Sequence, residues 1–467
     1  MTDLTPIRVG AGTSPAVPTL RSAGAAAICS RSVIMISGFA NSLLLPVVLN
    51  QRGIGQYFLA QLVIAGIGTF CQLGFSFSIP SQVTQAVARK DLGRARSLAV
   101  TMLCFSAGLG GLVVITGVVA SPWIVEFLEL ADRATWIAAL PVVAVVGASA
   151  SLAAVIVDLL RAVHAVRTAA NLAALASISV GAYAGFLLVI GQQATLSGAL
   201  LANLAGSMGI ITLGLSLFWL RSFDWPRSAH KPVQATALLR ETVPNFSTTL
   251  LLFGLSNLEV IILGSLGSLN EVAQYGLALR FSAVLVMPLA IANAAAAPLA
   301  VHALSTNDTA ALGGILARVS FGAAGTAGAF YIGFATVGYG FIALWDSKYH
   351  DTYWLTLVLG LGNVLHACGG AAGVLLMIWR DQNRAFMIVV ANSAVTVIFC
   401  LLGYRYGGMF GLAFAACSGN VLQVACFVLR ARARFGVDPS LLGAWRYCFF
   451  ERARSTPPAA AASSREG

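Results

Sequence analysis

The sequence predicts an all-α polytopic membrane protein with about twelve transmembrane helices, arranged as two parallel six-helix lobes around a central cavity. Hydrophobic residues make up 58% of the 467 residues and charged residues only 10%, whereas soluble domains carry about 25% charged residues. The apolar runs are long and do not alternate, which favours membrane helices of about 20 residues over β-strands of about 10. A repeated pattern in the two halves suggests the two lobes.

The repeat consists of two similar segments, one near the N-terminus and one in the middle of the chain. Each begins with Gly-x-x-Asn, at Gly38 and Gly254, and after an apolar run and a glycine-bearing turn resumes with Gln-Tyr-x-Leu-Ala, at Gln56 and Gln274. A proline follows each at the same distance. Because each copy holds six expected spans, an even number, the copies must be parallel in the membrane.

Hydropathy places the expected spans between polar clusters. Their limits are 24–49, 57–80, 97–120, 136–160, 172–190, 196–220, 246–266, 273–298, 319–345, 353–378, 386–402 and 407–428. The predicted organisation is therefore a disordered cytoplasmic N-terminus (1–23), an N-lobe (24–220), a cytoplasmic linker (221–245), a C-lobe (246–428) and a basic cytoplasmic tail (429–467). In the tail, Asp438 and Pro439 are expected to start an amphipathic helix that lies on the anionic inner leaflet.

The distribution of basic residues predicts the orientation. Thirteen lysine and arginine residues lie in the even-numbered links between spans, against four in the odd-numbered links. Basic loops remain on the cytoplasmic side, so both termini should be cytoplasmic. The net charge of +11 reflects these loops rather than nucleic-acid binding.

Signatures of soluble enzymes are missing from the sequence. It contains no HExxH, Walker A or GxSxG motif, and its eight cysteines form no CxxC pair. The expected outer links are also too short for a typical active-site loop. We therefore predict no catalytic residue, metal or cofactor, and a protein that is not an enzyme.

Ionisable residues inside the spans are few, and each costs about 2.5–3.5 kcal/mol at a helix centre. They are Arg31 in span 1, Glu259 in span 7 and Arg280 in span 8. Arg31 either extends towards the cytoplasm or lines a cavity. Arg280 either forms a structural ion pair with Glu259 or takes a substrate or coupling role.

Polar residues in the spans have two interpretations. Asn41, Asn257, Asn293 and Asn363 either hold neighbouring helices together through hydrogen bonds or contact substrate.

Two further titratable residues lie within or at the end of the expected spans. His366 in span 10 is either a hydrogen-bonded core histidine or a proton carrier. Asp158, at the inner end of span 4, is close enough to Arg161 to form a solvated surface pair.

Several of these features together resemble one known superfamily. They are Ser30-Arg31 and Gly38 in span 1, the turn into Gln56-Tyr57, Pro80 followed by a basic helix, Asn257-x-Glu259, and Ala273-Gln274-Tyr275-Gly276-x-Ala278-x-Arg280. The chain resembles the multidrug/oligosaccharidyl-lipid/polysaccharide exporters, and most closely their polysaccharide transporter branch, the O-antigen and exopolysaccharide repeat-unit flippases.

The resemblance implies a flippase of the bacterial inner membrane that moves an undecaprenyl-diphosphate-linked oligosaccharide by alternating access. Arg31, Arg280, Asn41 and Asn257 would then contact substrate, while Glu259 and His366 would serve coupling. A diphosphate crossing hydrocarbon needs fixed cations, which the arginines supply. Implied partners are the lipid-linked oligosaccharide, membrane lipids, a polysaccharide polymerase and a chain-length regulator.

The chain also departs from related patterns. Span 1 holds Arg31 and no acid, unlike the drug and cation antiporters that it resembles in other respects. Gly38-Phe39 is not followed by an arginine, and no further spans follow the twelfth, unlike lipid II flippases. Two alternatives stay open, which are a transporter of another solute on the same fold and a membrane polysaccharide polymerase.

Overall fold

The computed structural model describes residues 37–127, 133–163, 165–222, 225, 235–293, 300, 309–343, 349–378 and 382–447. All regular structure among these residues is helical, which confirms the all-α prediction. The helices of the first half are Ser37–Val48, α2 (Gln51–Gln72), α3 (Phe75–Ser78), a π-helix (Ile79–Val83), α4 (Thr84–Ala88), α5 (Leu92–Val119), α6 (Ser121–Phe127), α7 (Arg133–Ala162), α8 (Val166–Ala173), α9 (Leu175–Ile190) and α10 (Leu196–Arg221). Those of the second half are α11 (Ala235–Ser256), α12 (Leu258–Leu266), α13 (Leu269–Val284), Met287–Asn293, α15 (Thr309–Ala343), α16 (His350–Cys368), α17 (Ala372–Ile378), α18 (Gln382–Phe435) and α19 (Leu441–Arg446).

The described residues contain seven helices that are long and apolar enough to cross a membrane, or nine when each of two bent pairs is counted as one span. The longest of them, α18, is a hairpin and not a single rod. Its chain turns at Gly408, whose φ of 56° and ψ of −145° are not helical, and Asn392 Nδ2 donates to the carbonyl of Gly419 at 3.1 Å across the two arms. The hairpin therefore holds two of the predicted spans.

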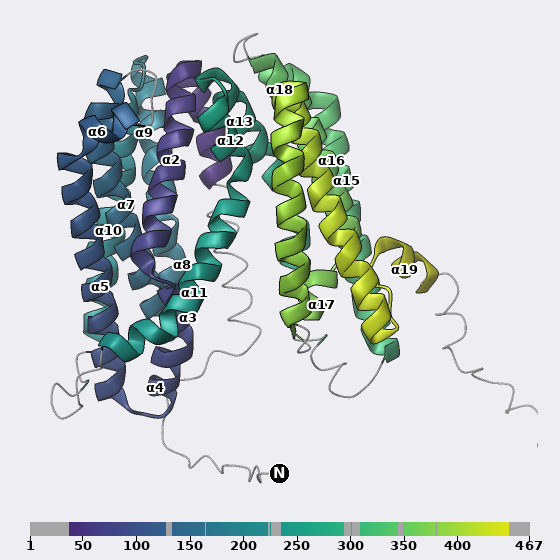
Figure 1. Cartoon of the computed structure of the whole chain (residues 1–467), viewed down its shortest axis with the longest axis horizontal. Helices are drawn as coiled ribbons and strands as arrows, with labels where there is room; N and C mark the ends of the chain where they lie inside the picture. Colours follow the sequence, from purple (N-terminus) through teal and green to yellow (C-terminus); the bar gives the residue numbers. More distant parts are fainter. Residues whose placement is uncertain are drawn as a thin grey trace, which may run out of the picture.

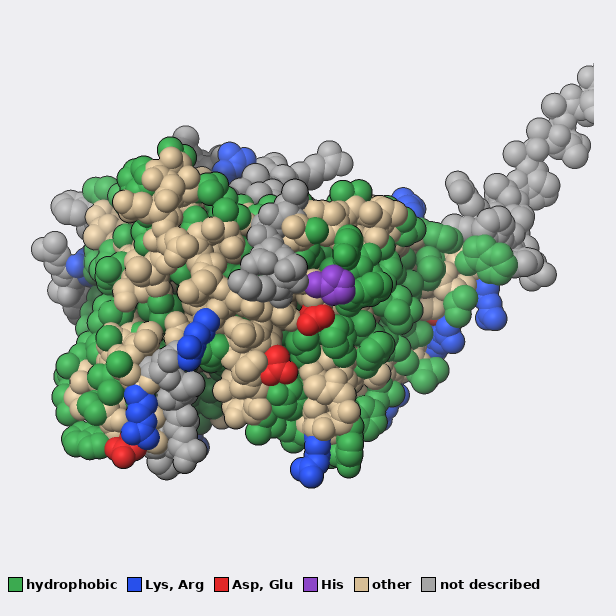
Figure 2. All heavy atoms as spheres, turned by 90° about the horizontal axis from the view of Figure 1, so that it is seen from above, with side chains coloured by type: hydrophobic (Ala, Val, Ile, Leu, Met, Phe, Trp, Pro, Cys, Tyr) green, Lys and Arg blue, Asp and Glu red, His purple; other side chains and the backbone are tan. Residues whose placement is uncertain are grey.

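The helices form two groups, an N-lobe of α2 to α10 and a C-lobe of α15 to α18, with α12 and α13 between them at the upper end of the view (Figure 1). The outer surface is apolar, as a lipid-facing surface must be; on α5, for example, Ile115 is 63% and Val119 60% exposed. At the upper end, charged side chains are few and scattered (Figure 2). We call this end the α6 end and the opposite one the α4 end, after the short helices that mark them (Figure 1).

The two copies of the repeat begin their second helices in the same way. Asn50 is the N-cap of α2 and accepts from the backbone N–H of Gly53 at 2.7 Å. Ser268 occupies the equivalent position before α13, where it forms a capping box with Glu271. Both caps satisfy backbone donors at the first helical turn, so the repeat is a structural one.

These two helices also pack against each other and join the lobes. A β-carbon on Gly55 of α2 would overlap the backbone carbonyl of Leu269 at the start of α13, and one on Gly276 would overlap the ring of Phe58. The glycines therefore allow the two helices to approach closely, the use of small residues that is common between membrane helices.

The helix that precedes α13 is broken. α11 and α12 meet at an angle of 62° at Asn257. Although the repeat assigns α11 to the second copy, it packs on α2 and α3 of the first, and the rings of Phe246 and Phe70 lie 5.9 Å apart. α11 begins at Ala235, so it includes the last part of the predicted linker 221–245.

At the α4 end, the chain folds back on each lobe after the last helix of that lobe. After α10, the Trp225 ring packs 5.9 Å from Phe218, and the Trp225 carbonyl accepts from Arg96 Nη1 at 3.1 Å. These contacts hold the first residues of the interlobe connection against the N-lobe.

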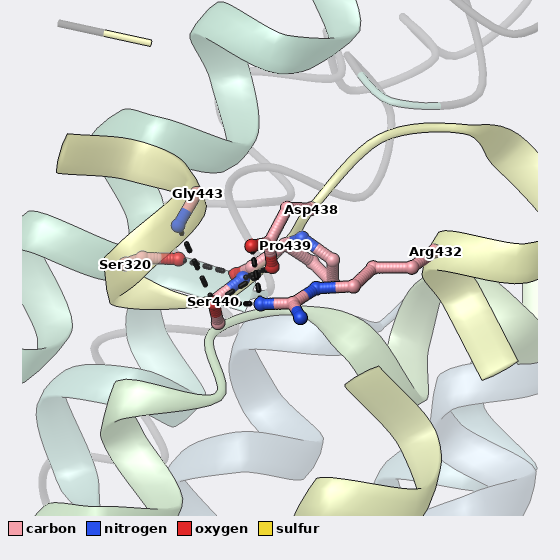
Figure 3. Close-up of polar contacts among 6 residues, drawn as sticks. All are labelled: Ser320, Arg432, Asp438, Pro439, Ser440 and Gly443. Carbon is pink, nitrogen blue, oxygen red and sulfur yellow. Dashed lines mark hydrogen bonds and ion pairs between the residues drawn. The ribbon is translucent and has the colours of Figure 1, made fainter. Parts of the chain in front are cut away.

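After α18, residues 437–447 form a segment that we call the C-terminal latch (Figure 3). Ser320 of α15 donates to the carbonyl of Pro439 at 2.7 Å, and both groups are buried. Asp438 accepts from Arg432 at the end of α18 and from the Ser440 backbone N–H at 3.0 Å. The N-cap of α19 is Ser440, which accepts from the Gly443 backbone N–H, rather than the predicted Asp438. The Asp438 carboxylate instead accepts from Arg432 and Ser440.

Candidate functional site

A cavity of about 620 Å³ lies within the N-lobe, a volume within the range of about 300–1,000 Å³ that is usual for ligand sites. Helix Ser37–Val48, α2, α7, α9 and α10 form most of its wall, and α13 contributes Arg280. Along α2 the lining extends from Tyr57 to Gln72. At 1.5 Å per residue this is a distance of about 20 Å, so the cavity is elongated along the helices.

Neutral polar groups cover much of the wall. Amides and hydroxyls reach the cavity from several helices, namely those of Asn41, Ser42, Tyr57, Gln61, Thr69, Gln72, Ser76, Ser177, Asn203 and Ser207. Amides and hydroxyls both donate and accept hydrogen bonds, so this wall suits a ligand that is itself rich in hydroxyl groups.

Among the described lining residues, the charged ones are Asp158, Arg161 and Arg280. Two cations and one anion leave an excess of one positive charge among them. The site therefore favours a ligand that carries negative charge as well as polar groups.

Asn41 forms part of the wall and also links two helices. Its Nδ2 donates to the carbonyl of Ser177 in α9 at 2.9 Å, and its Oδ1 occupies the space that a side chain at Gly181 would fill. The interpretation of this asparagine as a hydrogen-bonded link between helices is confirmed. Asn363 acts in the same way, since its Nδ2 donates to the Ser282 carbonyl at 2.9 Å.

Arg280 reaches the cavity from the C-lobe side. It is exposed and lies within electrostatic range of the Tyr57 side chain, which lines the same cavity. The next residue, Phe281, packs between Phe39 and Phe334, with ring centroids 5.7 Å and 6.0 Å apart, and this packing fixes α13 between the lobes. Arg280 is thus a cation held at a junction of the lobes and facing a polar cavity.

Glu259 does not hold Arg280 in place. Within the described part of the chain no ion pair joins these two residues, so the alternative of a structural pair between them is wrong. Glu259 lies in the first turn of α12, near Tyr275 and Cys400. These neighbours lie on α13 and α18, and the described lining of the N-lobe cavity does not include Glu259.

The remaining candidates are dispersed. Asn257 donates to the carbonyl of Phe253 in its own helix at 2.9 Å, at the break between α11 and α12. His366 is half-buried near the end of α16, and neither residue is among those described as lining the cavity. Arg31 lies outside the described residues.

Asp158 and Arg161 were expected to form a pair on the solvated surface. The pair exists, with Arg161 Nη1 2.7 Å from Asp158 Oδ1, but both residues line the cavity. The Asp158 side chain is only 12% exposed and that of Arg161 49%. One feature of the sequence indicated that Asp158 is enclosed. It interrupts a run of large apolar residues, which are expected to be buried.

Other lining residues were missed entirely. Gln61, Gln72 and Asn203 are polar residues inside apolar helices, and such residues usually face the interior of a helix bundle. That signal identifies an inward face, but it does not show which helices share one cavity.

Comparisons with known proteins agree with this architecture. The family described as polysaccharide biosynthesis protein matches residues 23–302, which is more than half of the chain. The chain belongs to the polysaccharide biosynthesis protein family. No curated protein sequence matches it.

Solved structures of low sequence identity share the fold of this polysaccharide biosynthesis protein. An inward-facing multidrug resistance MATE family transporter of the MOP superfamily superimposes with a TM-score of 0.67 and 18% identity, over 88% of this chain and 98% of that one. An outward-facing MATE transporter gives 0.62 and 14% identity, over 89% and 96%. A MOP superfamily transporter from Pyrococcus furiosus, described by the reversed polarity of its binding pocket, gives 0.63 and 14%, over 88% and 94%.

Proposed function

We propose that this protein moves an undecaprenyl-diphosphate-linked oligosaccharide repeat unit, of O-antigen, capsule or exopolysaccharide, across the bacterial inner membrane by alternating access. The observation that carries the proposal is the N-lobe cavity, which combines Arg280 with a wall of amides and hydroxyls. Amides and hydroxyls match the sugar hydroxyls, and the guanidinium matches the diphosphate. Membership of the polysaccharide biosynthesis protein family supports the same substrate class.

The proposed orientation places the α4 end in the cytoplasm. Arg89 and Lys90 directly follow α4, and Arg432 and Arg434 end α18 beside the C-terminal latch. Basic residues of this density remain on the cytoplasmic side of a membrane. The lipid-linked sugar would then enter the N-lobe cavity from the α4 end and leave at the α6 end after the lobes have rocked about α2 and α13.

In this scheme the polyprenyl chain stays in the bilayer beside the apolar outer face while the diphosphate and sugars pass through the cavity. A polysaccharide polymerase and a chain-length regulator would use the product on the far side. The protein itself forms and breaks no covalent bond in this step.

The test is translocation of a fluorescent lipid-linked oligosaccharide in proteoliposomes, measured by its accessibility to a membrane-impermeant lectin or glycosidase. We expect the full chain to move the lipid between leaflets, and Arg280→Gln to slow this transfer at equal reconstitution. Movement of a small cationic solute without movement of the lipid would favour the alternative of a secondary transporter. Formation of longer glycan chains by the purified protein would favour a polymerase.

A further inference from the structure

The Asp158–Arg161 pair and Arg280 lie at opposite ends of the cavity. Arg280 lies within electrostatic range of Tyr57, a residue seven positions after the N-cap of α2 at the α6 end. Asp158 interacts with Ser76, and the Ser76 hydroxyl donates to Gln72 Oε1 at 2.9 Å, at the other end of α2. Since Tyr57 and Gln72 are about 20 Å apart along the helix, the cavity holds one cation near each end.

The Asp158–Arg161 pair lies at the α4 end. It occupies the last turns of α7, and this part of α7 packs on the π-helix next to α4. The Arg161 side chain is half exposed, while that of Asp158 is nearly enclosed. An incoming anion therefore meets the guanidinium of Arg161 before it can reach the carboxylate.

The pair leaves Arg161 only partly engaged. A guanidinium has five N–H donors, and the contact with Asp158 joins one of its terminal nitrogens to one carboxylate oxygen. A phosphate group offers several oxygens and more negative charge, and it bonds a guanidinium through two parallel N–H groups. Phosphate is thus a stronger partner for Arg161 than the single-contact carboxylate.

We infer that the Asp158–Arg161 pair is the entry subsite for the diphosphate, in which Asp158 is a built-in counter-ion that phosphate displaces from Arg161. This inference rests on the proposed function and adds a second cation to it. In the empty cavity Asp158 holds the Arg161 side chain in the lining. When the lipid diphosphate arrives, Arg161 binds it, and the sugars extend along the polar wall towards Arg280.

The arrangement has a functional consequence for release. Because Asp158 competes for the same guanidinium, it weakens binding and keeps the anion from being retained at this subsite. Removing the carboxylate should therefore tighten binding, whereas removing the guanidinium should weaken it. A pair with a purely structural role would lose stability in both variants and would show no such opposite signs.

The experiment measures binding of farnesyl diphosphate, a short-chain lipid diphosphate, to the full chain in detergent micelles by microscale thermophoresis. Inorganic pyrophosphate and farnesol are the comparison ligands, which separate headgroup recognition from recognition of the isoprenoid. We expect Asp158→Asn to bind farnesyl diphosphate about tenfold more tightly and Arg161→Gln about tenfold more weakly, since a charge-assisted hydrogen bond is gained or lost. Pyrophosphate should follow the same order, and farnesol should not.

Two further variants keep the result interpretable. Arg167→Gln removes an exposed arginine close in the chain that does not line the cavity, and it should bind like the wild type. The double variant Asp158→Asn with Arg161→Gln leaves no unpaired charge, so it should fold and should bind as weakly as Arg161→Gln alone.

Weaker or unchanged binding in Asp158→Asn, in a preparation whose melting curve matches the wild type, would overturn the displacement. Equal binding by Arg161→Gln and the wild type would overturn the subsite while leaving the proposed function intact, because Arg280 would then carry the diphosphate. If the wild-type chain translocates no lipid-linked oligosaccharide in proteoliposomes and binds no farnesyl diphosphate, both proposals fail.

Discussion

The two copies of the repeat carry an asparagine at the same position of their first helices, and the two side chains make different contacts. In the N-lobe, Asn41 donates across to α9, and helix Ser37–Val48 is continuous through it. In the second copy, Asn257 donates back to its own helix, and the helix is broken there by 62°. The same motif thus joins two helices in one copy and marks a bend in the other.

This difference explains where the cavity lies. The first copy packs its opening helix against α9 and encloses a polar space between them and α7. The second copy bends, so α11 leaves its own lobe and packs on α2 and α3. The two copies are thus similar in structure, but the bend lets α11 of the second copy connect the two lobes.

The largest effect is expected where the two copies touch. Gly55→Ala places a methyl group against the backbone carbonyl of Leu269, which cannot rotate away as a side chain can. We expect a loss of stability of about 3 kcal/mol from overpacking, measured as a lower melting temperature in detergent. Gly108→Ala in α5, where nothing lies within 4 Å of the added carbon, is the matched control. Equal melting temperatures for the two variants would show that α2 and α13 do not pack this closely.

The next effect concerns the charge that the second copy alone carries. Arg280→Leu gives α13 the residue type that the first copy has at the equivalent Leu62. We expect transfer of the fluorescent lipid-linked oligosaccharide in proteoliposomes to slow about thirtyfold, since a hydrogen bond to a charged group contributes about 2 kcal/mol. Arg405→Leu, which removes an exposed arginine outside the described cavity lining, should transfer the lipid normally. An unchanged transfer rate in Arg280→Leu would show that this charge difference between the copies takes no part in transport.

A smaller difference should separate the two asparagines themselves. Asn41→Ala removes a hydrogen bond between helices, while Asn257→Ala removes one within a helix. Hydrogen bonds between membrane helices contribute about 0.6–2 kcal/mol, so we expect Asn41→Ala to lower stability by about 1 kcal/mol and Asn257→Ala by less. The measurement is unfolding of both variants in the same detergent. A larger loss for Asn257→Ala would reverse our account of the comparison.

The smallest effect is expected at the α4 end, where Trp225 packs against the N-lobe and the C-terminal latch packs against the C-lobe. Asp438→Asn weakens the partly exposed contact with Arg432. Hydrogen–deuterium exchange over residues 437–447 should show that the free energy of local opening falls by about 0.5 kcal/mol. Asp351→Asn, at an exposed acid of the other end, is the control. Unchanged exchange in Asp438→Asn would mean that the Ser320 contact alone holds the latch.

The same latch should respond to acid in a defined direction. Burial raises the pKa of Asp438, but hydrogen bonds from Arg432 and Ser440 outweigh it, so the net pKa is lowered. A lowered folded-state pKa means that the ionised carboxylate stabilises the latch. That contribution is complete above the ordinary aspartate pKa of about 4 and is lost as the pH falls through the lowered value. The protection of residues 437–447 from exchange, taken relative to the intrinsic exchange rate at each pH, should fall there.

Much of the fold was predictable because the positions of membrane helices can be recognised in the sequence. Lipid requires long apolar runs with internally bonded backbones, and such runs placed the spans correctly in α5, α10 and α18. The repeat was visible because Gly-x-x-Asn, Gln-Tyr-x-Leu-Ala and a later proline recur in the same order in both halves. The break at Asn257 was not predicted. No proline lies close to it, and the nearby Gly254 did not indicate a break because glycine is common in membrane helices.

The candidate site was only partly predictable. Arg280 and Asn41 were identified because polar residues in apolar helices must find a protein or water environment. That argument says nothing about which helix faces which, so Glu259 and Arg280 were considered as partners although they face different neighbours. For the same reason, the sequence could not distinguish Asp158 in a cavity wall from Asp158 on a solvated surface.

The sequence by itself determined that this protein is a duplicated bundle of membrane helices with few buried charges, because hydropathy and spacing are local properties of the chain. Only the tertiary structure decided that α11 crosses to the first lobe, that the polar cavity lies within the N-lobe, and that Arg280 reaches it from α13. These features depend on which helix faces meet, and close approaches such as that of Gly55 to Leu269 select those faces through contacts between residues far apart in the chain.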